Sequence, residues 1–149
     1  MDIRRVMTRS VVTASPDGTV REMAALMRER NVGSVVLIDA DDRPVGLITD
    51  RDLAITVVAD ARDPDEAASV LASSPVVSAH VEMDVEEVAA LMVRHGIRRL
   101  PVLDGERLAG MITLDDLAVR TGDRELAYNM TSQITRASLP DFYFHDRGG

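Results

Sequence analysis

Two Thr-x-x-Asp patterns carry the side chains best suited to ligand chemistry: Thr49 with Asp52, and Thr113 with Asp116. A carboxylate accepts two hydrogen bonds at once, which suits the cis 2′- and 3′-hydroxyls of a ribose, and the acid of dinucleotide-binding folds does comparable work. The Thr hydroxyl and the N–H groups of a helix start can face a phosphate. Thr followed by an acid three residues later is also a common helix cap, which by itself would explain both pairs.

The two patterns occupy equivalent places in a tandem repeat. Val-Val-Thr-Ala at residues 11–14 recurs as Val-Val-Ser-Ala at residues 76–79, an offset of 65. After one residue is lost from a loop, residues 46–54 match residues 110–118 at an offset of 64. Agreement over this length predicts internal duplication. We expect one repeat in residues 1–60, a linker helix and the second repeat in residues 61–120, and a C-terminal helix and tail in residues 121–149.

Each repeat predicts the order β-α-β-β-α, an α/β (α+β) fold. Capping-box patterns start the first helices, and Asn31 and Gly96 stand where these helices should end in a left-handed residue. Each small sheet exposes an apolar face, so the repeats are expected to bury these faces against each other. The expected strands span residues 11–13, 35–38, 45–48, 76–78, 100–103 and 109–112, and the expected helices start near residues 19, 49, 63, 84, 113 and 123, the linker helix running to residue 71 and the last to residue 131.

The repeated Gly-apolar-Ile-Thr-x-x-Asp-Leu, after an apolar strand pair and an Ala-Ala-Leu-Met helix, resembles the cystathionine-β-synthase (CBS) domain. Val-Met-Thr at residues 6–8 and Arg-Arg-Leu-Pro-Val at residues 98–102 match as well, so a tandem pair, called a Bateman module, would cover residues 1–120. Residues 49–53 look like those of stand-alone bacterial pairs. The resemblance implies a pseudo-two-fold pair with two clefts between the repeats. It also implies binding of AMP, ADP, ATP, S-adenosylmethionine or a dinucleotide such as NADH, and homodimers.

The same resemblance implies which residues would contact each part of such a ligand. Asp52 and Asp116 would hold the ribose beside their threonines. A basic residue at the start of the second strand contacts phosphate in related pairs. Arg98 and Arg99 stand there in the second repeat, where the first has Gly33-Ser34. We therefore expect one phosphate-accepting cleft near Arg99 and one weaker cleft, unless the arginines pair with neighbouring acids. The adenine would lie on the first and second strands, at Val12, Thr13 and Val35 in one repeat and at Val77, Ser78 and Leu100 in the other.

The composition of the chain limits the classes of partner that it is expected to bind. The chain has 149 residues, 17 basic and 25 acidic, with a net charge of −8 and no Cys. An acidic surface repels nucleic acid and anionic membranes, so neither is expected as a partner. Absence of a signal peptide or apolar span makes a cytoplasmic protein the default. His80, His95 and His145 share no metal-type spacing, and we expect no metal site and no tightly bound cofactor. Magnesium would arrive with a nucleotide phosphate.

The sequence predicts a binding module and not an enzyme, since no catalytic arrangement stands out beyond the two Thr-x-x-Asp pairs. Ligand binding would be relayed to an effector protein whose identity the sequence does not indicate. The alternative is a structural module that binds no ligand, forms homodimers and docks a partner through its helices and its aromatic tail. That tail contains Phe142, Tyr143 and Phe144, which we expect to pack on the chain's own helices, across a dimer interface or on another protein.

Overall fold

The computed structural model describes residues 1–140, which form two compact units. The first-repeat unit contains Ser10–Val77 together with the turn Leu103–Leu108. The second-repeat unit contains Met1–Arg9, Ser78–Val102 and the chain from Ala109 onward. The first nine residues therefore fold with the second repeat. The aromatic tail and His145 lie outside the described residues.

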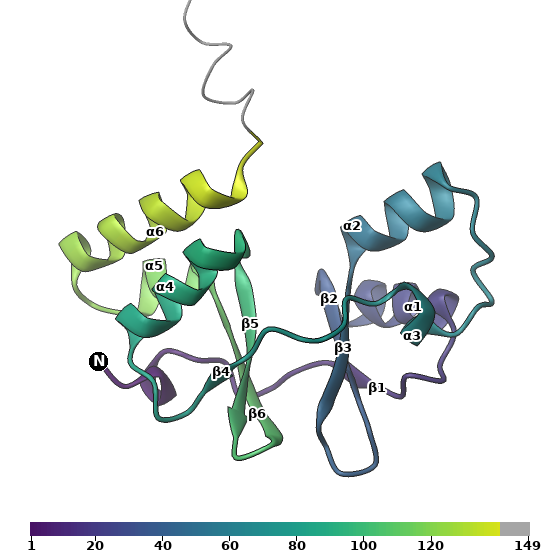
Figure 1. The fold of residues 1–149 in the computed structure, drawn as a ribbon, viewed down its shortest axis with the longest axis horizontal. Helices are drawn as coiled ribbons and strands as arrows, with labels where there is room; N and C mark the ends of the chain where they lie inside the picture. Colours follow the sequence, from purple (N-terminus) through teal and green to yellow (C-terminus); the bar gives the residue numbers. More distant parts are fainter. Residues whose placement is uncertain (141–149) are drawn as a thin grey trace, which may run out of the picture. The chain divides into compact units, whose positions relative to one another are not determined.

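In the first-repeat unit, three strands form a sheet in the order β1-β2-β3, with β1 parallel and β3 antiparallel to β2. A register shift opposite Leu37 and Ile38 leaves Val45 of β3 without a partner and marks an irregularity in that strand. α2 continues directly into a π-helical segment, η2. The elements are β1 (Thr13–Ala14), α1 (Val20–Arg30), β2 (Ser34–Ile38), β3 (Pro44–Thr49), α2 (Asp50–Leu53), η2 (Ala54–Ala59) and α3 (Ala68–Leu71) (Figure 1).

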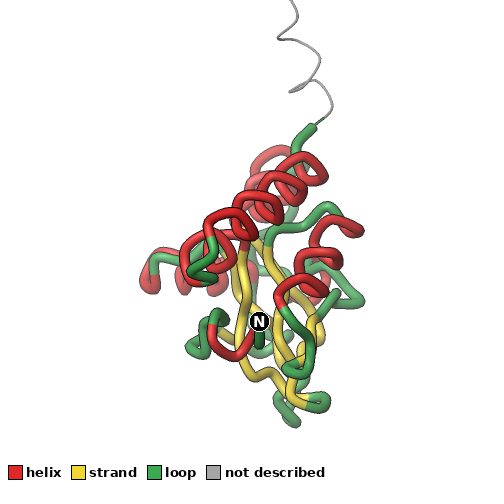
Figure 2. The backbone as a smooth tube through the Cα atoms, turned by 90° about the vertical axis from the view of Figure 1, so that its left-hand side faces the viewer, coloured by secondary structure: helices red, strands yellow, loops and turns green. Residues whose placement is uncertain are grey.

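The second-repeat unit repeats this plan with a sheet in the order β4-β5-β6 and adds one long helix. This helix, α6, packs on both α4 and α5, and Figure 2 shows it as the long red helix that leads to the grey trace. The elements are η1 (Ile3–Arg5), β4 (Ala79–His80), α4 (Val85–His95), β5 (Arg99–Asp104), β6 (Arg107–Thr113), α5 (Leu114–Arg120) and α6 (Arg124–Ser138).

Each unit has a core between its helices and its sheet. In the first-repeat unit, Met23 and Met27 of α1 pack with Leu37 of β2 and Ile48 of β3. The second-repeat unit buries side chains from the matching elements, among them Val88, Met92, Leu100, Ile112 and Leu117. The methionines of α1 and α4 thus serve as core residues, in keeping with their ability to fill irregular space. None of the helices described over residues 1–140 combines the length and the apolar character that a bilayer crossing requires.

The predicted ends of the first helix in each repeat are confirmed. α1 starts with a reciprocal capping box between Thr19 and Glu22, and α4 starts with the same box between Asp84 and Glu87. Both helices end in a left-handed residue, Asn31 at φ 54° and Gly96 at φ 62°. Asn and Gly adopt this conformation at lower cost than other residues, so each helix stops where its sequence indicates.

Several boundaries differ from the sequence predictions. The linker helix starts at Ala68 and not near Asp63, because the carbonyls of Pro64 and Glu66 accept hydrogen bonds from Arg21 and Val20 at the start of α1. This stretch thereby satisfies N–H groups that α1 leaves unpaired. The strands β1 and β4 begin later than expected and have two residues each. The last helix runs to Ser138 and not to residue 131.

Candidate functional site

The Thr-Asp pair of the first repeat forms a capping box that leaves one carboxylate oxygen without a protein partner. Asp52 Oδ2 accepts a hydrogen bond from the backbone N–H of Thr49 at 2.9 Å, and Thr49 Oγ1 accepts one from the N–H of Asp52 at 3.2 Å. Asp52 is half-buried, and within residues 1–140 its Oδ1 accepts no hydrogen bond and pairs with no cation. The pair therefore starts α2 and still presents one acceptor.

The equivalent carboxylate of the second repeat is more fully engaged. Asp116 Oδ2 accepts hydrogen bonds from the N–H and the hydroxyl of Thr113, both at 2.9 Å. Its Oδ1 accepts one from Thr8 Oγ1 at 3.4 Å and lies 3.4 Å from Nη1 of Arg120. Asp116 is 8% exposed. Both of its oxygens thus have partners inside the second-repeat unit.

In each unit, the residue just before the second strand lies beside the first residue of the helix that follows the third strand. The carbonyl of Gly33 accepts a hydrogen bond from Asp50 N–H at 3.0 Å, and that of Arg98 accepts one from Leu114 N–H at 2.8 Å. In the first-repeat unit, Val12 and Thr13 lie next to β2, where the Val12 carbonyl accepts from Val36 N–H. The unit therefore brings residues 12 and 13 and the Thr-Asp pair to one small sheet and its connections.

The predicted adenine residues differ in accessibility. Val12 and Thr13 are half-buried, as are Val77 and Ser78, which precede β4. Val35 and Leu100 are fully buried and belong to the cores of their units. Their side chains therefore support the sheets and present no surface of their own.

The two arginines that could bind phosphate have different surroundings. Arg98 is exposed and donates from Nε to Ser138 Oγ of α6 at 2.8 Å. Arg99, the first residue of β5, is half-buried and forms no ion pair or side-chain hydrogen bond within the described part of the chain. Neither arginine pairs with an acid there, so Arg99 remains the better candidate for an anion.

The sequence did not single out Thr8 or Arg120 as site residues. The Nη1 of Arg120 also donates to the carbonyls of Val6 and Met7 and to the hydroxyl of Thr8, at 3.2 to 3.4 Å. Asp116 and Arg120 are four residues apart on α5, a spacing that favours ion pairs on a helix. The ion pair between Asp116 and Arg120 could therefore have been predicted from the sequence. The contact of Thr8 with Asp116 could not, because it depends on how the first nine residues fold.

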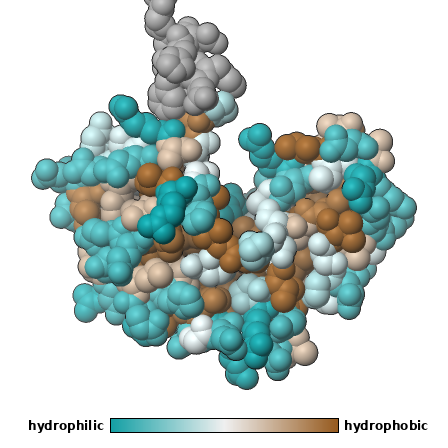
Figure 3. Space-filling view, viewed as in Figure 1, coloured by the Kyte–Doolittle hydropathy of each residue, from teal (hydrophilic) through white to brown (hydrophobic). Residues whose placement is uncertain are grey.

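A second feature is an apolar groove on the helices of the first-repeat unit. It is lined mainly by α1, by α2 with η2, and by Pro64. Val58, which lines the groove, is 80% exposed and the nearby Ile55 is 45% exposed. Figure 3 shows brown, hydrophobic surface over this unit at the upper right. At its rim, a hydrogen bond to Asp65 and the charge of that carboxylate raise the pKa of Arg21 above its ordinary value.

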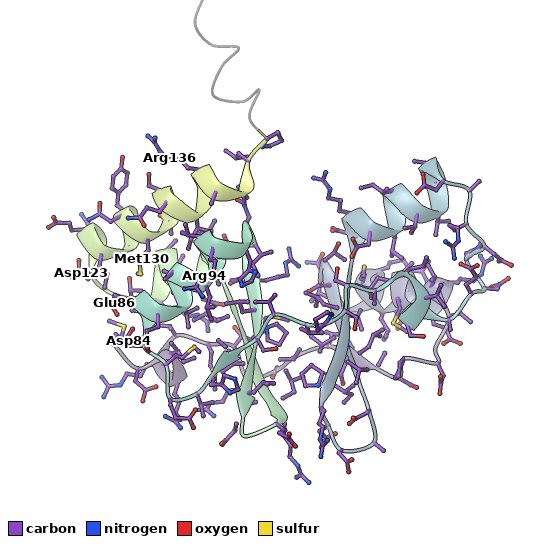
Figure 4. All side chains as sticks on the ribbon, in the orientation of Figure 1. Asp84, Glu86, Arg94, Asp123, Met130 and Arg136 are labelled. Atoms are coloured by element: carbon purple, nitrogen blue, oxygen red, sulfur yellow. The ribbon has the colours of Figure 1, made fainter. Side chains whose placement is uncertain are left out.

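The matching helices of the second-repeat unit are covered. α6 lies on α4 and α5 and buries Ala127, Met130 and Ile134. Met130 lies on the side of α6 that faces α4 (Figure 4). Close to the C-terminal end of α6, the Ala137 carbonyl lies 3.0 Å from where a Cβ on Gly96 would be. Within residues 1–140, α6 therefore covers the helices of the second-repeat unit, and the first-repeat unit contains no equivalent helix of its own.

The described residues 1–140 hold no group of three or more acidic or His side chains arranged to bind a metal ion.

The CBS-domain family model matches this chain twice, over residues 3–59 and 67–120. The chain therefore belongs to the CBS-domain family and carries two copies of the domain. The fold agrees, since structures of CBS-domain pairs align with it over most of its length.

Individual relatives share most of the chain. It is 35% identical over 137 residues to the CBS domain-containing protein YhcV of Bacillus subtilis, covering 92% of this chain and 97% of that protein. It is 43% identical over 119 residues to the protein MK0525 of Methanopyrus kandleri, covering 78% of this chain but only 61% of that protein. The CBS domain protein PAE2072 of Pyrobaculum aerophilum, solved in complex with AMP, is 27% identical with a TM-score of 0.76, covering 89% and 99%.

Proposed function

We propose that this chain is a regulatory module that binds an adenosine-containing nucleotide and carries out no reaction of its own. The observation that carries the proposal is the carboxylate of Asp52, whose Oδ1 has no partner within residues 1–140 although Oδ2 is held in place by Thr49. A fixed acceptor of this kind suits a ribose diol. The AMP bound by the similar protein PAE2072 supports this class of ligand.

The remaining contacts follow from the chemistry of such a ligand. Backbone groups near Val12 and Thr13 in one repeat, and near Val77 and Ser78 in the other, would hold the adenine. Arg99 would hold a phosphate, because an acidic chain must supply positive charge locally to bind an anion. A magnesium ion would come with the phosphates of ADP or ATP.

The output of binding would be a change in how the protein packs. A ligand shifts an equilibrium only between states that it binds unequally, so the nucleotide must favour one arrangement of the repeats or of two copies. An effector protein would read this change in the cytoplasm. In this proposal residues 1–60 and 61–120 act as the sensing repeats, and residues 121–149 act as an appended helix and tail.

The apolar groove of the first-repeat unit favours a second role, self-association. A second copy is the occupant that we propose for it, because the chain already covers the matching helices of its other repeat with an amphipathic helix. Uncovered apolar surface of this kind is typical of an interaction site. If no nucleotide binds, this interaction role is the function that remains.

Calorimetric titration tests the proposal. Wild-type protein would be titrated with AMP, ATP, S-adenosylmethionine and NADH, alongside the matched variants Asp52→Asn and Asp116→Asn, which keep side-chain size and remove the charge. We expect heat with at least one ligand and an affinity roughly 10- to 150-fold lower in one variant, since a lost charged acceptor costs roughly 1.5–3 kcal/mol. No heat from folded wild-type protein with any of the four ligands would contradict the proposal.

A further inference from the structure

The two ribose carboxylates begin with the same geometry. In both repeats Oδ2 accepts the backbone N–H of the capping Thr at 2.9 Å, so in each repeat Oδ1 is the oxygen left for a ligand. Any difference between the repeats in binding a diol must therefore come from what surrounds Oδ1.

In the second repeat that oxygen is already in use. Thr8 Oγ1 donates to Asp116 Oδ1, and the positive charge of Arg120 lies 3.4 Å away. The same arginine also holds Thr8 and the two carbonyls before it, so one guanidinium ties the carboxylate to the N-terminal segment. Each contact is long for a hydrogen bond. Together with the 8% exposure of Asp116, they leave little of the carboxylate to an incoming ligand.

The position of Thr8 is set by the backbone. Its N–H and carbonyl exchange hydrogen bonds with Met111 of β6, both at 2.8 Å. A Cβ on Gly110 would lie 2.8 Å from the Thr8 carbonyl, so the segment passes close to the sheet. Ile3 and Val6 are fully buried. The backbone contacts therefore keep Thr8 beside β6, with its hydroxyl within reach of Asp116.

The first repeat has the same backbone arrangement with different side chains. Ser73 stands where the second repeat has Thr8, and it exchanges hydrogen bonds with Leu47 at 2.9 and 3.3 Å. Ser73 is exposed and makes no hydrogen bond to Asp52 within residues 1–140. Thr56 stands in place of Arg120 and donates to the backbone carbonyl of Asp52 at 2.6 Å. Among residues 1–140, no cation pairs with Asp52 as Arg120 pairs with Asp116.

We infer that Thr8 and Arg120 withhold Asp116 from ligands, so that the chain binds one nucleotide diol per chain, at Asp52. This inference rests on the proposed function and goes beyond it, because it assigns the inequality of the repeats to two residues outside the Thr-x-x-Asp pairs. It also reverses the order of the two sites suggested by Arg98 and Arg99.

Stoichiometry tests the inference. Titrated with AMP, the wild type and Asp116→Asn should each bind one equivalent, and Asp52→Asn should show the reduced affinity expected under the proposed function. The double variant Thr8→Val with Arg120→Gln, which removes both Oδ1 partners at nearly constant volume, should bind two. Two equivalents in the wild type, with one lost in Asp116→Asn, would overturn the inference and leave the proposed function standing. No AMP binding by either the wild type or the double variant, both folded by circular dichroism, would contradict the proposed function itself.

A reciprocal experiment tests the same inference without requiring the variant Thr8→Val with Arg120→Gln to fold. Ser73→Thr with Thr56→Arg places the same pair beside Asp52 and should weaken AMP binding at least about tenfold. The control, Ser73→Thr with Thr56→Gln, adds a long side chain without the charge and should change affinity less than about threefold. Equal affinity in these two variants would overturn the assigned role of the arginine.

Discussion

The two repeats share strand order, helix caps and the Thr-x-x-Asp pair, yet they differ in how accessible the carboxylate and the helices are. The second repeat has its carboxylate held by Thr8 and Arg120 and its helices covered by α6. The first repeat leaves a carboxylate oxygen without a partner in residues 1–140 and keeps an apolar groove on its helices. The same local motif can therefore have different surroundings in the two copies of a duplicated domain.

Replacing Ile134 by Asp tests how far α6 belongs to the second-repeat core. Ile134 is fully buried on α6, so the variant loses apolar burial and places a charge in its stead. We expect the free energy of unfolding to fall by roughly 4 kcal/mol, measured by urea denaturation. The control Tyr128→Ser changes a residue of the same helix that is 72% exposed, and it should cost less than about 0.5 kcal/mol. Equal losses would mean that α6 does not complete this core.

Replacing Val58 by Asp tests whether the groove of the first-repeat unit binds a second copy. A charge at the centre of an apolar interface should raise the dimer dissociation constant at least about tenfold in sedimentation equilibrium. Val119→Asp is the matched control, because Val119 is as exposed as Val58, at 79% against 80%, and lies on α5 of the other repeat. Dissociation by the control to the same extent would move the interface away from the first repeat.

The left-handed helix ends offer a smaller contrast. Gly96→Ala should destabilise the protein by about 2 kcal/mol, since an L-residue is strained at φ 62° and its Cβ would meet the Ala137 carbonyl. Asn31→Ala should cost only about 1 kcal/mol, because Asn already accepts part of this strain. Thermal unfolding measures both, and a larger loss at Asn31 would contradict the close approach of α6 to Gly96.

The N-terminal caps should show the smallest contrast. Thr19→Ala and Asp84→Ala each remove the side-chain acceptor of an equivalent capping box, and each should cost about 1 kcal/mol. Chemical denaturation of the two variants should therefore agree to within about 0.5 kcal/mol. A clear difference would show that the two first helices do not contribute equally.

Much of this fold could be predicted from the sequence because the residues that determine it are close together in the chain. The caps of α1 and α4, their left-handed ends and the strand hairpins depend on residues close together in the chain, and all were predicted. The start of α3 was wrong because residues 64 and 66 bond to the first turn of α1, a contact across 43 or more residues. The engagement of Asp116 was missed for the same reason, since Thr8 lies 108 residues away.

The central claim is that Asp52 holds the ribose of a nucleotide while Asp116 does not. A crystal structure of the protein with saturating AMP tests it most directly. We expect electron density for a ribose whose 2′- and 3′-hydroxyls donate to Asp52, while Thr8 and Arg120 still contact Asp116. A ribose on Asp116, or no nucleotide at Asp52, would contradict it.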